Sequence, residues 1–255
     1  MTPRMDLSST GCRFVECTTS TQDEARRWVE QGAPDGSVVV ADQQTQGRGR
    51  QDRTWLSPPG KNLYLSRVVQ GKTDDLRLTP LLGALAAERA IAGFLPPDRR
   101  AGIKWPNDVW VDGHKVAGIL CELLLAPQPT VLLGIGVNLN MEPSDFPGDL
   151  RAPATSLGIL CGRFVDRQAF LISLLAELDS LQPWLVLCPN RLLALYRERC
   201  LTLGQQVRVS VPGTPPFVGL ASGLAEDGAL LVEEAPGQVR RIEAGDVDLC
   251  RICDG

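Results

Sequence analysis

Residues 102–125 read GIKWPNDVWVDGHKVAGILCELLL, and this stretch decides the fold. The apolar run 109–125 is interrupted by Asp112-Gly113, a dipeptide that is typical of the tight turn of a β-hairpin. A shorter strand at 102–105 ends at Pro106, which cannot continue a sheet and fixes the turn that follows it. We therefore predict a hairpin preceded by a short strand and followed by another strand at 130–139.

Outward from this hairpin, helical and strand patterns fill residues 1–200, after a loose tail over the first ten. Helices are predicted at 21–31, 81–94, 166–181 and 190–199, and strands at 37–42 and 62–69. Thr21 with Glu24 caps the first helix, and Thr79-Pro80 opens the second. From about Thr202 the pattern changes to short strands between Pro/Gly turns, at 206–211, 217–224, 229–234 and 238–242. We predict an α/β (α+β) body over 1–200 and a small β-barrel over 201–255.

The composition bounds the class of protein. The 255 residues are 44% hydrophobic and 22% charged, which is ordinary for a globular protein and excludes a disordered one. With 26 basic and 30 acidic side chains the net charge is −4, so non-specific attraction to nucleic acid is disfavoured. No continuous apolar run approaches the roughly 18 residues of a membrane span, and the N-terminus lacks a signal-peptide core. Eight cysteines are too few for a disulfide scaffold. We predict a cytoplasmic protein.

Residues 43–60 form a polar loop between two strands, and within it residues 47–53 read GRGRQDR. Glycines let backbone N–H groups turn onto an anion, and the guanidinium groups between them add paired donors for phosphate or carboxylate oxygens. The alternative is a solvated basic loop or an RNA contact. The loop is neither a Walker loop nor a dinucleotide fingerprint, since it lacks the required spacing and no helix follows at once.

The hairpin brings Lys115 back towards Lys104 and Asp108, with Asn107 beside them. Two ammonium groups and one carboxylate near an arginine loop suit a reaction on phosphates, and Asp108 is a reasonable ligand for Mg²⁺. The alternative is a surface hairpin with solvated charges. A third stretch, GIGVNLN at 134–140, places glycines inside an apolar strand, which indicates close approach of an adenine ring or of another strand.

Covalent catalysis and a zinc site find no support in the sequence. There is no G-x-S-x-G motif, and the single histidine, His114, is best interpreted as a turn residue. Cys250 and Cys253 form a single CxxC, whereas structural zinc needs four ligands. We interpret this pair as packing at the end of a strand.

Taken together, these motifs resemble those of the biotin protein ligases. The resemblance covers about residues 14–250 and rests on GRGRQDR with Trp55, KWPND at 104–108, HKVAGILCE at 114–122 and GIGVNLN at 134–140. It implies activation of biotin with MgATP to biotinyl-5′-AMP, and transfer of biotin to one lysine of the biotin carboxyl carrier domain of a carboxylase. It also implies a mixed-sheet body similar to class II aminoacyl-tRNA synthetases and a C-terminal SH3-like barrel.

The resemblance assigns roles to individual residues. The residues implied to bind biotin are Ser20, Thr21, Gln22, Gln44, Arg48, Gly49, Arg50, Lys115 and Gly118. Those implied to bind the nucleotide are Arg50, Arg53, Trp55, Lys104, Asn107, Gly136 and Asn138. The implied catalytic residues are Lys115, Arg50 and Asp108, and Asp108 would also face Mg²⁺.

Asp52 departs from the family pattern, which has glycine at this place in the loop. Asp tolerates positive φ better than most residues, so the turn can survive. Because Ser20 comes too early in the chain for a preceding DNA-binding domain, and because the net charge is negative, no repressor activity or DNA partner is expected. No membrane partner is expected either, since no apolar run is long enough to span a membrane. The expected oligomeric state is a monomer or weak homodimer. The alternatives are a lipoate protein ligase, a non-catalytic biotin sensor and, least favoured, an RNA-binding module.

Overall fold

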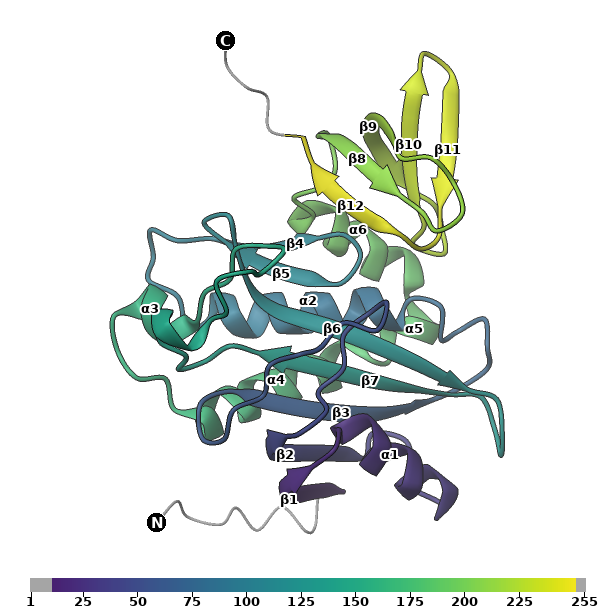
Figure 1. Cartoon of the computed structure of the whole chain (residues 1–255). Coiled ribbons are helices and arrows are strands. Elements are labelled where there is room, and N and C mark those ends of the chain that lie inside the picture. The colour runs from purple at the N-terminus through teal and green to yellow at the C-terminus, as the bar shows by residue number, and fades with distance from the viewer. Residues whose placement is uncertain (1–10, 251–255) are drawn as a thin grey trace.

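A seven-stranded mixed sheet forms the body of the computed structural model, which describes residues 11–250 (Figure 1). Its strands are Cys12–Thr18 (β1), Val38–Gln44 (β2), Leu63–Gln70 (β3), Ala101–Lys104 (β4), Asp108–Val111 (β5), His114–Leu124 (β6) and Thr130–Val137 (β7). Their order is β1-β2-β3-β7-β6-β5-β4. β1 and β2 are parallel, and all other neighbours in this sheet are antiparallel. The predicted α/β body is confirmed.

The hairpin of β5 and β6 turns where the sequence predicts it. Both turn residues have positive φ, 49° at Asp112 and 75° at Gly113, as a two-residue turn between twisted strands requires. His114 follows the turn on the surface, and its Nδ1 lies 2.8 Å from the carbonyl oxygen of Asp112. His114 is therefore the first residue of β6, directly after the turn, and not a residue of the turn itself.

Two features at the start of the chain differ from the prediction. β1 was not predicted, because it is an edge strand paired only with β2 and most of its side chains are exposed, so it shows no apolar pattern. The helix Thr21–Glu30 (α1) is capped by Ser20 and not by Thr21. Ser20 is extended, and its Oγ accepts a hydrogen bond from Gln22 N at 3.3 Å. The hydroxyl of Thr21 points elsewhere, towards Gln44 and Ser66.

The helix Thr79–Ala92 (α2) is buried along most of its length, because it packs against the sheet and against two further helices, Arg167–Leu181 (α4) and Pro189–Arg199 (α6). Thr79 does not cap it: the N-cap position is Leu78, which makes no side-chain bond. Thr79 N donates to Leu76 O at 3.1 Å, so a preceding turn runs directly into the helix. Two short helices, Leu157–Cys161 (α3) and Trp184–Leu187 (α5), were not predicted.

The stretch Arg167–Leu187 has the length and mean hydropathy, 1.4, of a candidate membrane span. In the structure it is divided by Gln182 and Pro183 into α4 and α5. The apolar side chains of α4 that face the core are Phe170, Leu171, Leu174, Leu178 and Leu181. Packing against α2 and the core accounts for the apolar side chains on this face, whereas Ile172, Val186 and Leu187 are exposed.

The C-terminal part is a five-stranded antiparallel sheet. Its strands are Gln206–Ser210 (β8), Phe217–Leu224 (β9), Leu230–Ala235 (β10), Gln238–Ile242 (β11) and Asp246–Leu249 (β12), in the order β11-β10-β9-β8-β12. β12 was not predicted, because it is only four residues long and carries two carboxylates, so its sequence lacks the apolar pattern of a strand. The indole of Trp105 joins the two parts by donating to Gly228 O at 3.0 Å, and Trp105 N donates to Thr202 Oγ1 at 2.9 Å.

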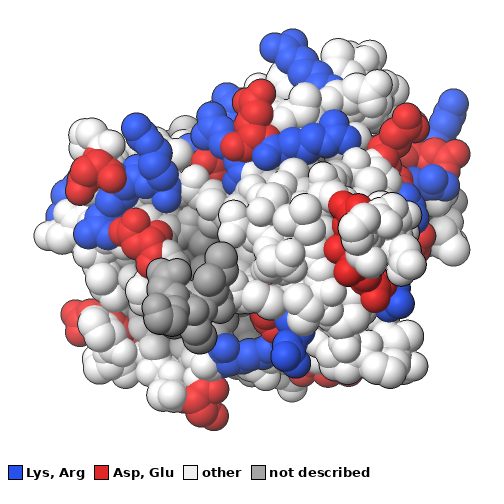
Figure 2. Space-filling model, turned by 90° about the horizontal axis from the view of Figure 1, so that it is seen from above, with Lys and Arg blue, Asp and Glu red and all other residues white. Residues whose placement is uncertain are grey.

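The other elements begin and end within a few residues of their predicted bounds. The first ten residues and Cys253 lie outside the described residues. On the face shown in Figure 2, acidic and basic side chains are interspersed. Ion pairs such as Arg240 with Glu234, at 2.7 Å, are typical of the C-terminal sheet. That face does not show the continuous basic surface that an RNA-binding module would need.

The packing of α2 on the sheet predicts a destabilising effect of Gly83→Ala. A Cβ at Gly83 would lie 2.6 Å from Leu133 Cδ1, and overpacking costs about 1–3 kcal/mol, against the roughly 1 kcal/mol that Ala gains over Gly inside a helix. We expect a net loss of about 1 kcal/mol in the free energy of unfolding, measured with urea. The control is Gly93→Ala, where φ is −67° and the nearest atom is 3.5 Å away, and no loss is expected. Equal stability of the two variants would contradict this packing.

Candidate active site

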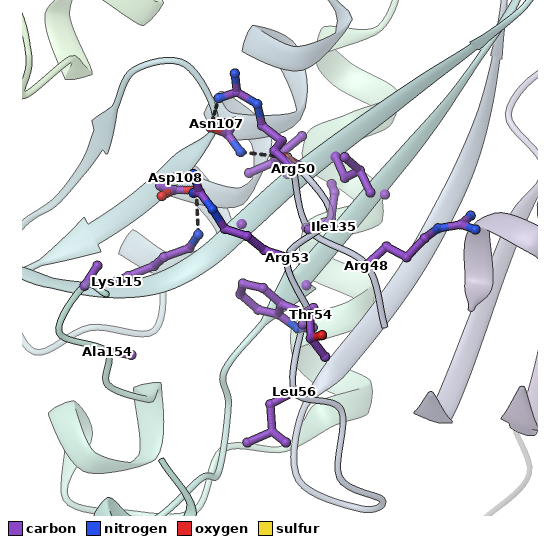
Figure 3. A pocket seen from close by; sticks show the side chains of 18 of the residues that line it. Arg48, Arg50, Arg53, Thr54, Leu56, Asn107, Asp108, Lys115, Ile135 and Ala154 are labelled. Atoms are coloured by element: carbon purple, nitrogen blue, oxygen red, sulfur yellow. Dashed lines mark hydrogen bonds and ion pairs between the residues drawn. The ribbon is translucent and has the colours of Figure 1, made fainter. Parts of the chain in front are cut away.

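A cavity of about 430 Å³, partly open to solvent, is lined by segments that lie between Ser20 and Asp248. The loop between β2 and β3, the ends of β4 and β5, the β6–β7 surface, the loop after β7 and residues 245–248 form its wall (Figure 3). Every site residue predicted from the sequence lies in this wall: Ser20, Thr21, Gln22, Gln44, Arg48, Gly49, Arg50, Arg53, Trp55, Lys104, Asn107, Asp108, Lys115, Gly118, Gly136 and Asn138.

Hydroxyl and amide groups form one part of the wall, at the start of α1 and the end of β2. Gln44 Oε1 accepts from Thr21 N at 2.9 Å and from Thr21 Oγ1 at 3.2 Å, and Gln44 Nε2 donates to Ser57 Oγ at 2.9 Å. Ser66 Oγ in turn donates to Thr21 Oγ1 at 2.8 Å. These bonds fix the orientation of the Gln44 amide, which a buried polar network must do to remain satisfied.

Gln22 connects α1 to the centre of the sheet. Its Nε2 donates to Leu120 O at 3.0 Å and to Leu132 O at 3.3 Å, while its Oε1 is buried and has no hydrogen-bond partner among the described residues. Gly134 makes room for this side chain, because a Cβ there would lie 2.8 Å from Gln22 Nε2. A buried acceptor without a partner is costly, so Gln22 Oε1 suits a ligand that donates an N–H.

The loop 47–53 is folded back on itself. Gly49 N donates to Arg53 O at 2.6 Å, and Arg53 N donates to Arg50 O at 3.3 Å. Gln51 and Asp52 both have positive φ, 55° and 56°. Asp52 thus adopts the conformation that the sequence analysis allowed for it, and the turn persists without glycine.

The arginines of this loop have different partners. Arg48 points away from Lys115 and Asp108 (Figure 3) and pairs with Asp23 at 2.8 Å and Glu122 at 3.0 Å. It therefore anchors the loop to α1 and β6.

Arg50 stays within the cavity. It donates to Asn107 Oδ1 at 2.9 Å and to Gly245 O at 3.3 Å. Burial lowers the pKa of Arg50, and the neighbouring carboxylates of Asp108 and Asp246 oppose that effect. Asn107 in turn donates to Ile119 O at 2.8 Å, so its amide is fixed from both ends.

Lys115 pairs with Asp108, as the hairpin prediction implied, with 2.7 Å between Nζ and Oδ1. Its Nζ also lies 5.3 Å from the centre of the Trp55 ring, within the range of a cation–π interaction. Lys104 is directed elsewhere, to Asp248 at 3.0 Å. The structure therefore places Lys104 in the same cavity as Lys115 but pairs it with the C-terminal sheet.

Trp55 lies on a glycine patch of the sheet. Gly118 and Gly136 are opposite each other in the β6–β7 ladder, and a Cβ at either would lie 2.8 Å or 2.5 Å from atoms of the Trp55 ring. Glycine is therefore required at both positions, because the Trp55 ring packs directly against the backbone of the sheet there. Trp55 Nε1 is buried without a hydrogen-bond partner among the described residues.

Four further residues of the wall were not predicted from the sequence: Arg151, Gly245, Asp246 and Asp248. Arg151 pairs with Asp246 and, at 3.1 Å, with Asp248. Arg151 stands alone in a loop of Pro, Gly and Asp, and the two carboxylates come about a hundred residues later. No local pattern links them, because only the folded chain brings the two segments together.

The glycine patch predicts that Gly136→Ala will displace Trp55. The indole should become more exposed, so its fluorescence emission should move to longer wavelength. The shift should vanish in the background Trp55→Phe, which identifies the responsible tryptophan. Gly223→Ala serves as a control, because the nearest atom to its Cβ is 3.9 Å away. An unchanged spectrum in Gly136→Ala would contradict the contact.

Two family models match separate parts of the chain. The Biotin/lipoate A/B protein ligase family matches residues 14–140, and the biotin protein ligase C terminal domain matches residues 202–249. The first range holds most of the residues in the cavity wall, and the second holds the five-stranded sheet.

Individual relatives match over most of the chain. The bifunctional ligase/repressor BirA of Bacillus subtilis is 34% identical, with 92% of this chain and 73% of that protein covered. The biotin–[acetyl-CoA-carboxylase] ligase of Mycobacterium tuberculosis is 36% identical, with 91% and 86% covered. The biotin protein ligase from Aquifex aeolicus, solved in complex with biotin and ATP, has a TM-score of 0.79 at 27% identity, with 95% and 99% covered. The chain therefore belongs to the biotin/lipoate A/B protein ligase family and stands among its biotin protein ligases.

Proposed function

We propose that this chain activates biotin with MgATP to biotinyl-5′-AMP and transfers the biotin to a lysine of a biotin carboxyl carrier domain. One observation carries the proposal: a single cavity joins a neutral hydrogen-bonding cluster at Gln22 and Gln44 to a cluster of cations at Arg50, Lys104 and Lys115. A neutral ring with a carboxylate tail, activated by a polyphosphate, needs both in one place.

The neutral cluster is the proposed site of the biotin ureido ring. Ser20, Thr21, Gln22 and Gln44 line it, and the unpaired Gln22 Oε1 suits a ureido N–H. The dithiolane ring of lipoate has no N–H and would leave this acceptor unpaired, which favours biotin over lipoate. Gly118 would serve the biotin end indirectly, because it makes room for the Trp55 ring and the Lys115 side chain that face the ligand.

The cations are proposed to hold the biotin carboxylate and the phosphates. Lys115 and Arg50 would contact the carboxylate and the α-phosphate, with Gly49 supplying the turn of the loop. Arg48 supports this loop through Asp23 and Glu122. Because Asp108 fixes the Lys115 ammonium at 2.7 Å, the charge is in position before the substrates arrive.

The nucleotide is proposed to lie over Trp55, whose ring Gly136 seats against the sheet, with Arg53, Lys104 and Asn107 towards its phosphates. Trp55 Nε1 offers one unpaired donor. Asn138 is 6% exposed and donates to Thr155 O at 3.1 Å, so it holds the loop after β7 against the pocket.

The donor set fits Mg²⁺ that enters with ATP. No group of three or more His, Cys, Asp or Glu side chains that could hold a metal occurs among the described residues. Mg²⁺ that enters with ATP keeps waters and phosphate ligands and takes only one or two carboxylates from a protein. Asp108 is the residue that we propose faces it. Bound Mg²⁺ would neutralise charge on the phosphates.

The chemistry is acyl activation by position and charge. A carboxylate oxygen of biotin attacks the α-phosphorus, the bond to the bridging oxygen breaks, and pyrophosphate leaves with the electron pair. The acceptor amine then attacks the carbonyl carbon, AMP leaves, and the new amide nitrogen loses a proton. No protein nucleophile is needed. Burial raises the pKa of Cys121, the thiol beside Arg50, well above its usual range, so it stays protonated.

The acceptor is proposed to be the carrier domain of acetyl-CoA carboxylase or a related carboxylase, acting in the cytoplasm. The relative from Mycobacterium tuberculosis bears the name of such a ligase. All cysteines in the part that the structure describes are free thiols, which is typical of a reducing compartment. A catalytic domain over 1–200 and a barrel over 201–255 remain our proposed division.

The proposal predicts pyrophosphate exchange into ATP that depends on biotin and not on lipoate. Lys115→Ala should reduce the exchange rate about 10²–10³-fold, because it removes a charge aimed at the reacting groups. Lys72→Ala, at an exposed lysine, is the matched control and should leave the rate unchanged. Exchange that occurs with lipoate and not with biotin would contradict the assignment of biotin as the substrate. Biotin binding without any exchange would indicate a sensor.

Gln22→Met tests the biotin end separately. It keeps the length of the side chain but removes the acceptor, so the KM for biotin should rise about tenfold or more, while the KM for ATP stays unchanged. Because Gln22 also joins α1 to the sheet, thermal unfolding is measured on the same sample. Equal changes in both KM values would argue against a ureido contact.

A further inference from the structure

Three distant segments meet at one carboxylate of the C-terminal sheet. Asp246, at the start of β12, pairs with Arg53 from the loop between β2 and β3 and with Arg151 from the loop after β7. We call these three residues the Asp246 clasp. Next to it, Asp248 pairs with Arg151 at 3.1 Å and with Lys104 at 3.0 Å.

The strand geometry explains why β12 can present two carboxylates to the body. Side chains alternate along a strand, so Asp246 and Asp248 share one face and Val247 takes the other. Val247 is 3% exposed in the core of the sheet, and β12 pairs with β8 through Asp246 and Ser210. Packing on one face thus holds the carboxylates on the other, beside the cavity.

The clasp is charged at neutral pH. Burial alone would raise the pKa of Asp246, but the hydrogen bonds from Arg53 and Arg151 outweigh it, and the pKa is lowered. Its side chain is 19% exposed, against 43% for Arg53 and 51% for Arg151. Two long, half-exposed side chains therefore share one largely buried anion.

Both loops that the clasp joins line the cavity. Arg53 belongs to the loop whose turn encloses Gly49 and Arg50, and Arg151 to the loop that Asn138 and Lys115 hold through Thr155. Arg50 also reaches the C-terminal part, at Gly245 O. Opening either loop at this end therefore requires a charge pair with Asp246 to break.

We propose that Asp246 is a positioning residue that keeps both loops closed over the acyl-adenylate until the acceptor lysine arrives. This inference rests on the proposed function. The mixed anhydride reacts with water, so exclusion of water has to come from the covering loops. The C-terminal sheet thereby takes part in the retention of the intermediate without contacting the reacting atoms.

The test is a burst experiment without acceptor protein. Wild-type enzyme with biotin and ATP should release one pyrophosphate per site and then turn over slowly, because the retained intermediate blocks the site. Asp246→Asn, nearly the same shape without the charge, should raise the steady rate about tenfold, since it weakens two partly exposed ion pairs. Filtration should recover correspondingly more free biotinyl-AMP. The burst amplitude should persist, and Asp246→Glu should restore most of the retention.

Two further variants separate this role from a general structural one. Arg151→Ala breaks the clasp from an exposed side chain, so it should leak like Asp246→Asn, and the double variant should leak no more than either. Glu234→Ala removes an ion pair with Arg240 between β10 and β11 and should not leak. A lower Tm without leakage, or equal leakage in Glu234→Ala, would overturn the inference. Steady pyrophosphate release from the wild type without a burst would overturn this inference alone, whereas no release at all would overturn the proposed function, and this inference with it.

Discussion

A cation that is partly removed from water needs an anionic partner, and this requirement determines how the loops of the structure are placed. Lys115 is held by Asp108 within one hairpin, but the other partners come from separate segments. Arg48 reaches α1 and β6, Lys104 reaches β12, and Arg53 and Arg151 share Asp246. Arg48, Arg53 and Arg151 lie outside the strands, so their pairs fix loops of the chain, and the charged groups of the cavity wall also hold its loops in place.

These pairs also determine how a polyanion could enter. Guanidinium groups have five donors and can keep a carboxylate while they receive a phosphate, whereas an ammonium group has three and is more compact. The arginines here stand in the loops, and the lysines stand at strand ends of the sheet. Binding of a triphosphate can therefore redistribute hydrogen bonds among partners that already face the cavity, with little reorganisation of the chain.

Much of the fold and the membership of the site could be predicted from the sequence, because the signals are local. A few neighbouring residues are enough to predict the Asp112-Gly113 turn, the end of the strand at Pro106 and the close approach at the glycines of the β6–β7 ladder. The edge strand β1, the strand β12 and Arg151 could not be predicted, since their reasons are contacts between distant segments. The predicted cap of α1 was wrong for a related reason: the Thr21 hydroxyl donates to Gln44, and Ser20 is the N-cap residue.

Trp105 stands between the two parts of the molecule, with both its backbone N–H and its indole N–H bonded to the C-terminal part. Its neighbours Asn107 and Asp108 belong to the cavity wall. Detachment of the C-terminal sheet would expose the Trp105 amide to hydrogen exchange while the seven-stranded sheet remained folded. The exchange rate of that amide would therefore measure the free energy of detaching the C-terminal sheet. Because residues 245–248 belong to the cavity wall, the same detachment would open the cavity. The stability of the C-terminal sheet and access to the cavity are then set by the same equilibrium.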